Sequence, residues 1–128
     1  MKLIYVAGKY RDTTKADELL NIHRAALYAA YQWHEGNSVI CPHLNTLKCW
    51  ELNPATHDTY IAGDLKQVEV ADEIHILPDW ETSKGTKLER DLAMKLGKPI
   101  IYVSSLLMRM LQQGWERKRI EERKANAS

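Results

Sequence analysis

The chain has 128 residues, of which 45% are hydrophobic and 27% charged, as in a soluble globular protein, and this composition excludes a disordered chain. Its 18 Lys and Arg residues against 17 Asp and Glu residues give a net charge of +1, which argues against a nucleic-acid partner. No apolar run reaches the roughly 20 residues that cross a bilayer, and two cysteines are typical of a reducing cytoplasm. We therefore expect one cytoplasmic domain over residues 1–128, without a membrane partner.

The first segment of the chain predicts a strand followed by a long helix. Residues 2–7 are β-branched and aromatic and end at Gly8, which is typical of a buried strand. Thr14 and Asp17 form a possible capping box at the start of the helix, and Gly36 ends it. The apolar residues of this helix recur at steps of three and four: Leu19, Ile22, Ala26, Ala29, Ala30 and Trp33.

The middle of the chain predicts strand, loop, helix and strand. Residues 38–41 form a short strand, and residues 42–55, with two prolines and two asparagines, are typical of a long loop. A loop of this length in a small domain is usually functional. A helix is expected over about 56–71 and a strand over 73–77. The inner face of this helix is expected to carry Ile61, Leu65 and Val68.

The last part predicts a loop, a helix, a strand and a final helix. Residues 79–84 form the loop, and Gly97 ends the helix after it. A strand over 99–103 precedes a charged C-terminal helix over about 105–125. An apolar stripe on the helix before Gly97 is expected from Leu88, Leu92 and Leu96.

This alternation of strands and helices predicts an α/β fold, a three-layer flavodoxin- or Rossmann-like sandwich with helices on both faces. The parallel sheet is expected to have four to five strands. If the strand order is 2-1-3-4, ligands bind between the first and third strands, beyond their carboxyl ends. The loops at that point are residues 8–12 and 79–86, which are both polar and contain glycine.

Two acidic residues are candidates for catalysis. Glu89 falls at the edge of the predicted apolar stripe, where a carboxylate can serve as nucleophile or base. Alternatively, Thr86 and Glu89 form a capping box, and Glu89 only satisfies backbone N–H groups. Asp64 lies beside the inward-facing Ile61 and Leu65, although it can equally be a solvated helical residue. Two carboxyl groups at one site could divide the roles of acid and nucleophile.

The two polar loops supply candidate substrate-binding residues. The loop over 79–86 offers hydroxyls, a lysine and a helix N-terminus, which suit a phosphate, although Ser83 or Thr86 can also be ordinary caps. Neither loop has the spacing of a nucleotide-hydrolysing phosphate loop or of a dinucleotide-binding motif. The predicted substrate-binding residues are Gly8, Tyr10, Arg11, His43, Asp79, Trp80, Ser83, Lys84 and Gly85.

Cysteine and histidine residues do not predict a metal site. Cys41, His43, Cys49 and His57 have irregular spacing and lack a CxxC motif. We interpret His43 as a side chain at the edge of a pocket. No cofactor is expected.

Three motifs together resemble the nucleoside 2-deoxyribosyltransferase-like family, in particular a small phage and bacterial branch. The resemblance covers about residues 2–103, and its third motif is the most specific. The motifs are Tyr5-Val6-Ala7-Gly8 with Tyr10-Arg11; Gly63-Asp64-Leu65 with Ala71-Asp72; and Ser83-Lys84-Gly85-Thr86-Lys87-Leu88-Glu89 ending in Ala93, Leu96, Gly97, Lys98 and Pro99.

The resemblance implies a flavodoxin-like sheet and cleavage of an N-glycosidic bond. The nucleophilic glutamate of the family would fall on Glu89 and its aspartate near the base on Asp64. Enzymes of free deoxynucleosides carry an aspartate six residues before the glutamate, where this chain has Ser83. Relatives that cleave nucleoside 5′-monophosphates have serine there.

These observations predict an enzyme that cleaves a nucleoside 5′-monophosphate, or a nucleoside, through a covalent glycosyl-glutamate. One alternative is a nucleoside 2-deoxyribosyltransferase that exchanges bases on free deoxynucleosides. Another is a non-catalytic nucleotide-binding or sensing module. We expect the chain to bind a small nucleoside or nucleotide. We also expect it to form at least a dimer with a second copy of itself, through the helix over 56–71 or the last helix.

Overall fold

The computed structural model describes residues 1–127 and contains a parallel four-stranded sheet in the order β2-β1-β3-β4. The predicted fold class and strand order are therefore confirmed. The strands and their connecting helices are β1 (Leu3–Ala7), α1 (Lys15–His34), β2 (Ser38–Ile40), α4 (His57–Val70), β3 (Glu73–Ile76), α5 (Lys84–Lys95), β4 (Ile100–Tyr102) and α6 (Ser105–Ala127).

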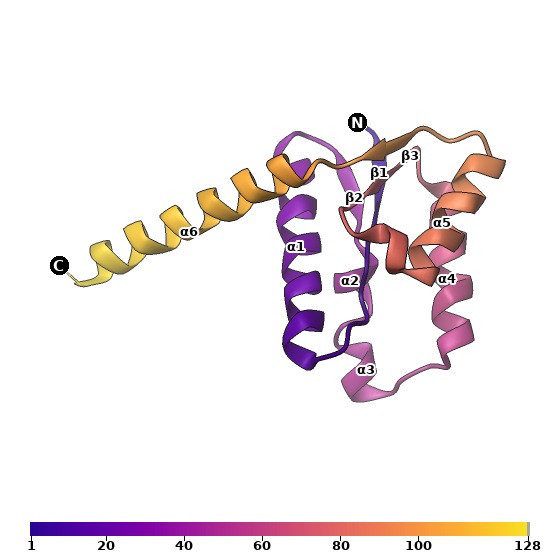
Figure 1. Ribbon diagram of the computed structural model, residues 1–128, viewed down its shortest axis with the longest axis horizontal. Coiled ribbons are helices and arrows are strands. Elements are labelled where there is room, and N and C mark those ends of the chain that lie inside the picture. The colour runs from indigo at the N-terminus through magenta and orange to yellow at the C-terminus, as the bar shows by residue number, and fades with distance from the viewer. Residues whose placement is uncertain (128) are drawn as a thin grey trace.

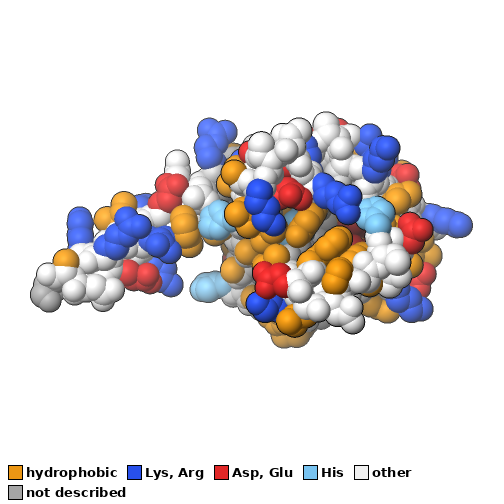
Figure 2. Space-filling model, turned by 90° about the horizontal axis from the view of Figure 1, so that it is seen from below, with side chains coloured by type: hydrophobic (Ala, Val, Ile, Leu, Met, Phe, Trp, Pro, Cys, Tyr) orange, Lys and Arg blue, Asp and Glu red, His pale blue; other side chains and the backbone are white. Residues whose placement is uncertain are grey.

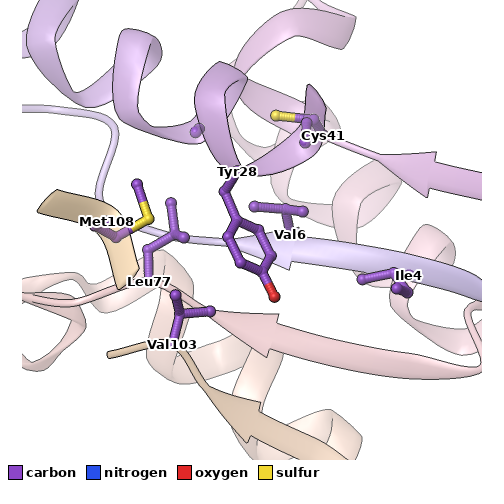
Figure 3. Close-up of a cluster of buried hydrophobic side chains, with 9 residues drawn as sticks. Ile4, Val6, Tyr28, Cys41, Leu77, Val103 and Met108 are labelled. Atoms are coloured by element: carbon purple, nitrogen blue, oxygen red, sulfur yellow. The ribbon is translucent and has the colours of Figure 1, made fainter. Parts of the chain in front are cut away.

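Helices cover both faces of the sheet, with α1 and the start of α6 on one side and α4 and α5 on the other (Figure 1). Side chains alternate along β1, so that Ile4 and Val6 face α1 while Tyr5 and Ala7 face α4 and α5. Figure 3 shows the cluster on the α1 side, where Tyr28 packs between the sheet and Met108 of α6. All four of these β1 residues are at most 1% exposed, so the sheet is a rigid support for the segments that follow it.

The predicted cap of α1 is confirmed. The N–H of Asp17 donates to Thr14 Oγ1 over 3.1 Å, and the Thr14 hydroxyl donates to the Asp17 carboxylate over 2.9 Å. Gly36 has a φ of +90°, which a residue with a side chain rarely adopts. Local signals therefore mark both ends of this helix in the sequence.

The expected long loop over residues 42–55 is only partly correct. It contains two single-turn helices, α2 (Pro42–Asn45) and α3 (Cys49–Leu52). Pro42 occupies the first turn of α2, where its missing N–H costs nothing. The segment lies at the carboxyl end of the sheet (Figure 1).

The expected apolar stripe on α5 is only partly correct, because only Leu92 of its three leucines packs against the core. Leu88 and Leu96 are 48% and 47% exposed, whereas the fully buried residues of this helix are Thr86 and Ala93. Glu89 lies between these two on the same face of the helix. Small side chains occur here because α5 packs against both α4 and β3, and close approach leaves little room.

Helix α6 has two parts. Its first turns pack against α1 through the buried Met108 and the half-buried Leu107 and Leu111. The remainder extends away from the body of the protein (Figure 1). Among residues 1–127, no helix combines the length and the apolar character needed to cross a membrane.

Candidate active site

A cleft of about 560 Å³ opens at the carboxyl ends of the strands. Its walls are the segment after β1, the short helices α2 and α3, and the first turns of α4 and α5. Figure 2 looks onto this end of the molecule, where apolar side chains lie among Lys, Arg and His side chains. All but two of the predicted site residues line the cleft, namely Gly8, Tyr10, Arg11, His43, Asp64, Ser83, Lys84, Gly85 and Glu89.

Glu89 is held on the sheet side of α5, and it is not part of the helix cap. The cap is Ser83, whose Oγ accepts hydrogen bonds from the N–H and the hydroxyl of Thr86 over 3.2 and 2.9 Å. The alternative of a capping box at residues 86–89 is therefore wrong, because the helix begins three residues earlier. Glu89 Oε2 is buried and has no hydrogen-bond partner within the described chain. The polar group nearest to this carboxyl group within the described chain is the hydroxyl of Tyr5.

Asp64 lies on α4, which packs side by side with α5. Its side chain is half-buried in the cleft, so it is not a residue of the solvated helix face. Burial raises its pKa to about 6. The cleft thus contains the partly buried carboxyl groups of Asp64 from α4 and Glu89 from α5, while the exposed Asp58 of α4 also lines it.

The two carboxyl groups also act on each other. Burial and, to a smaller degree, the charge of Asp64 raise the pKa of Glu89 to about 8. Because the two groups titrate as a pair, they hold one proton between about pH 6 and 8. With these values the proton lies mainly on Glu89 in the free protein, and Asp64 is the ionised member of the pair.

Tyr5 is a residue of this site that the sequence analysis missed. It is fully buried in β1, and the Glu89 carboxylate, after burial, is the main cause that raises the pKa of its hydroxyl. Tyr5 Oη and Glu89 Oε2 have no other partner among residues 1–127, and the Tyr5 hydroxyl is close enough to Glu89 that its hydrogen bond opposes the rise in the pKa of Glu89. The only signal was the alternation of β1, which places Tyr5 on the face that α5 covers.

One wall of the cleft favours an anion. Ser83 accepts both of its hydrogen bonds at Oγ, so its hydroxyl proton remains free for a ligand. The N–H groups of Lys84 and Gly85 belong to the open first turn of α5, where the helix dipole adds positive potential. Ordinary capping and phosphate binding are therefore compatible at Ser83.

The opposite wall is aromatic. Trp50 of α3 stacks on Tyr60 of α4, with ring centroids 4.8 Å apart and planes 20° apart. Arg11 lies at this wall, because its guanidinium approaches His57 Nδ1 over 3.4 Å. Arg11 therefore lines the same cleft as Ser83, and its guanidinium bonds to the start of α4.

His43 and Gly8 are fixed by packing. His43 is 4% exposed, and its Nε2 donates to the backbone carbonyl of Lys9 over 3.0 Å, which leaves Nδ1 as an acceptor. Burial lowers its pKa, so the ring is neutral near pH 7. A Cβ on Gly8 would lie 3.0 Å from Leu77 Cδ1, so glycine lets the end of β1 approach the end of β3 closely.

Two predicted substrate-binding residues lie outside the cleft. Asp79 adopts a φ of +67° and lines a separate cavity on the α1 side. The 3-10 turn η1 (Trp80–Thr82) directs Trp80 back toward the sheet, where it packs against Tyr102 and under the guanidinium of Arg90. This turn explains the difference, because it directs the middle of the loop away from the cleft.

No three His, Cys, Asp or Glu side chains in residues 1–127 are grouped so that they could hold a metal ion. Cys41 is buried, and burial raises its thiol pKa to about 11, while Cys49 is exposed. His43 and His57 line the cleft on different elements and contact different partners.

The chain matches the model of a known protein family. A family model described as a domain of unknown function, DUF4406, matches residues 2–102. The chain belongs to this family. The match covers the whole sheet of this DUF4406 protein and ends at the last residue of β4.

The solved structure of a 2-deoxyribosyltransferase from the psychrotolerant bacterium Bacillus psychrosaccharolyticus has a similar fold. The TM-score is 0.56 with 19% identical residues, over 83% of this chain and 79% of that one. The nucleoside 2-deoxyribosyltransferase-like fold of this DUF4406 chain, expected from its motifs, is therefore confirmed. None of the curated proteins matches the chain.

Proposed function

We propose that this protein hydrolyses the N-glycosidic bond of a nucleoside 5′-monophosphate through a covalent intermediate on Glu89. The observation that carries the proposal is the pair of carboxyl groups, Glu89 and Asp64, in one cleft with pKa values raised to about 8 and 6. Raised pKa values in a cleft are typical of acid–base and nucleophilic groups. The fold shared with a 2-deoxyribosyltransferase supports the same class of chemistry.

In the proposed reaction, a carboxylate oxygen of Glu89 attacks C1′ and forms a glycosyl ester. The C1′–N bond breaks, its electron pair stays on the base nitrogen, and Asp64 donates the proton that this nitrogen needs. In the free protein the higher pKa of Glu89 keeps the single proton of the pair on Glu89, so substrate binding must move this proton to Asp64 before attack occurs. Water then attacks C1′, Asp64 accepts its proton, and Glu89 is released as a carboxylate. The products are a free base and a sugar 5-phosphate.

The walls of the cleft suggest how the substrate is oriented. Helices α4 and α5 both run back from the carboxyl end of the sheet, so Asp64 and Glu89 lie deeper than the first turns. With C1′ at this depth, the 5′-phosphate would bind at Ser83 and the first turn of α5. The base would lie toward the stacked pair of Trp50 and Tyr60.

The second candidate is transfer of the sugar to another base. The similarity in fold to a 2-deoxyribosyltransferase favours it, because the same glycosyl-enzyme would be attacked by a base nitrogen in place of water. The two candidates differ only in the group that accepts the sugar.

One experiment distinguishes these possibilities. The full chain is incubated with the common nucleosides and their 5′-monophosphates, with and without a second base, and the products are separated by chromatography. Release of free base from monophosphates supports the proposal, whereas a new nucleoside formed only with added base supports transfer. Tight binding without release of base by wild-type protein, identical to that of Glu89→Gln, would indicate a binding module.

A further inference from the structure

A second cavity, of about 380 Å³, lies on the other side of the β1 loop from the cleft. It is formed between α1, the start of α6 and the segment after β3. Of the residues named so far, only Lys9 lines both spaces. The cavity is therefore a separate site on the opposite face of the sheet, at the same carboxyl end.

Two arginines line this cavity without partners. Arg24 comes from α1 and Arg109 from α6, and within residues 1–127 neither guanidinium has an ion pair or a hydrogen bond. The polar neighbours are occupied: Asn21 donates to the Tyr10 carbonyl and to Asp12 over 3.2 Å each, and Gln112 bonds to His23 and Glu116. The two guanidinium groups are thus the cations of this surface that have no partner in the described chain.

The charge of the cavity is positive. Lys9 is already 3.6 Å from Asp12, so it is largely compensated. One carboxylate, Asp79, lines the cavity against the two arginines. The first turn of α6, which begins at Ser105, adds the positive end of a 23-residue helix. An anion bound here would be attracted by both guanidinium groups and by the helix terminus.

The rest of the lining is apolar. Leu20, Leu27, Leu77, Pro78 and Met108 form it, and the volume exceeds what an inorganic phosphate occupies. A cavity with an apolar lining and a few convergent polar groups is typical of a small-molecule site. The lining fits an anion that carries an apolar or aromatic group.

We propose that this cavity binds a small phosphate monoester, with its phosphate between Arg24 and Arg109 and its organic group against the leucines and Met108. Guanidinium groups bind phosphate through two parallel hydrogen bonds each, which gives this site its preference for phosphate over a monovalent anion. The proposal goes beyond the activity of the cleft and does not depend on it.

The test is a titration of the full chain with phenyl phosphate and with inorganic phosphate, followed by ¹H–¹⁵N spectra at constant ionic strength. Amides of Leu77, Asp79 and Ser105 report on this cavity, and amides of Lys84 and Gly85 report on the cleft. We expect saturable shifts in the first group, with phenyl phosphate binding several times more tightly than phosphate.

The double variant Arg24→Gln/Arg109→Gln should weaken binding at this cavity at least tenfold and leave the shifts at Lys84 and Gly85 unchanged. The matched control is Arg117→Gln/Arg123→Gln, which removes the same charge from the distal part of α6 and should bind like wild type. Unchanged binding in the first variant, or equal weakening in the control, would overturn the proposal. Equal affinity for the two ligands would overturn the role of the apolar lining. None of these outcomes depends on turnover in the cleft.

Discussion

The shared proton of Glu89 and Asp64 is the single-residue feature on which the proposed chemistry depends. Hydrolysis requires the pair to hold one proton, and the pKa values of about 6 and 8 define that window. We therefore predict a bell-shaped dependence of kcat/KM on pH, which rises near pH 6 and falls near pH 8. Because a phosphate monoester also titrates near pH 6, the parent nucleoside is the control substrate. A flat profile for the nucleoside between pH 5 and 9 would contradict the pairing.

Replacement of Glu89 by glutamine has separate expected effects on turnover and on the stability of the folded protein. Glu89→Gln should lower turnover by about a thousandfold or more, because an amide cannot form the glycosyl ester. Folding raises the pKa of Glu89 from 4.5 to about 8, so the folded state binds the extra proton and wild type loses stability as pH rises through that range. The variant, which has no charge to bury, should therefore be more stable than wild type at pH 9, by on the order of 3 kcal/mol.

Thermal unfolding of both proteins at pH 4.5 and pH 9 measures this difference. The gap in Tm should be large at pH 9 and nearly absent at pH 4.5, where both side chains are neutral in the folded state. A variant that is less stable than wild type at both values would show that Glu89 is a structural residue.

Single residues also show how far the sequence predicts the site. Glu89 and Asp64 could be found because acidic residues beside predicted core positions are unusual and because the motifs match a family. Tyr5 could not, since a tyrosine in an apolar strand is usually core, and only the packing of α5 against β1 brings Glu89 to its hydroxyl. Arg11 lines the cleft, but its hydrogen bond to His57, which is 46 residues away in the chain, has no local signal in the sequence.

At the scale of elements, features that depend on neighbouring residues could be predicted from the sequence, whereas features that depend on tertiary packing could not. The cap at Thr14 and the glycine after α1 are local features, and they allow both ends of that helix to be predicted. Of the stripe expected on α5, Leu88 and Leu96 are exposed, because the sheet and α4 together select small residues for its buried face, and only Leu92 packs against the core. Similarly, α2 and α3 are single turns whose apolar residues show no period, so they could not be distinguished from a loop.

The first turn of α5 is the element that would select a phosphorylated substrate. Ser83→Asp keeps a capping side chain but places a carboxylate where the phosphate is proposed to bind. We predict that kcat/KM for a 5′-monophosphate falls by about tenfold to a hundredfold, since a charge-assisted hydrogen bond contributes about 1.5–3 kcal/mol. The value for the parent nucleoside should change much less.

The control for this variant is Thr56→Asp. Thr56 is the N-cap of α4 and accepts from the N–H of Thr59 over 3.2 Å, so the change adds the same charge to a capped helix at the same end of the sheet. It should leave the preference for monophosphates nearly unchanged. If Ser83→Asp alters both substrates equally, Ser83 acts only as a helix cap.

At the scale of the whole molecule, the cleft and the second cavity lie at the carboxyl end of the sheet and are separate from each other. The cleft opens toward α4 and α5, and the second cavity opens toward α1 and α6, with the segment after β1 between them. This arrangement follows from the strand order, because the chain leaves β1 toward one face and β3 toward the other. Substitutions in one space are therefore expected to leave the geometry of the other intact.

The shape of the molecule also bears on its assembly. Helix α6 would measure about 34 Å at 1.5 Å per residue, and its distal part extends from the body without packing against it (Figures 1 and 2). Isolated helices of this kind are marginal in water unless a partner covers them. Leu106 and Met110, on the side of α6 away from α1, are 61% and 57% exposed, and Tyr102 on the open edge of the sheet is 53% exposed. An apolar surface of this kind is typical of an interface.

We predict that the chain is at least a dimer at micromolar concentration and that α6 forms the contact. Leu106→Lys/Met110→Lys should convert it to a monomer in light scattering coupled to size-exclusion chromatography. Burial of each apolar side chain contributes about 1.5–3 kcal/mol, and a twofold contact loses it on both protomers, so the dissociation constant should rise at least a hundredfold. The control Leu52→Lys/Met94→Lys changes the same residue types at positions 74% and 61% exposed on α3 and α5. That control should remain a dimer, and a wild-type monomer at these concentrations, or equal dissociation of the two variants, would contradict a contact through α6.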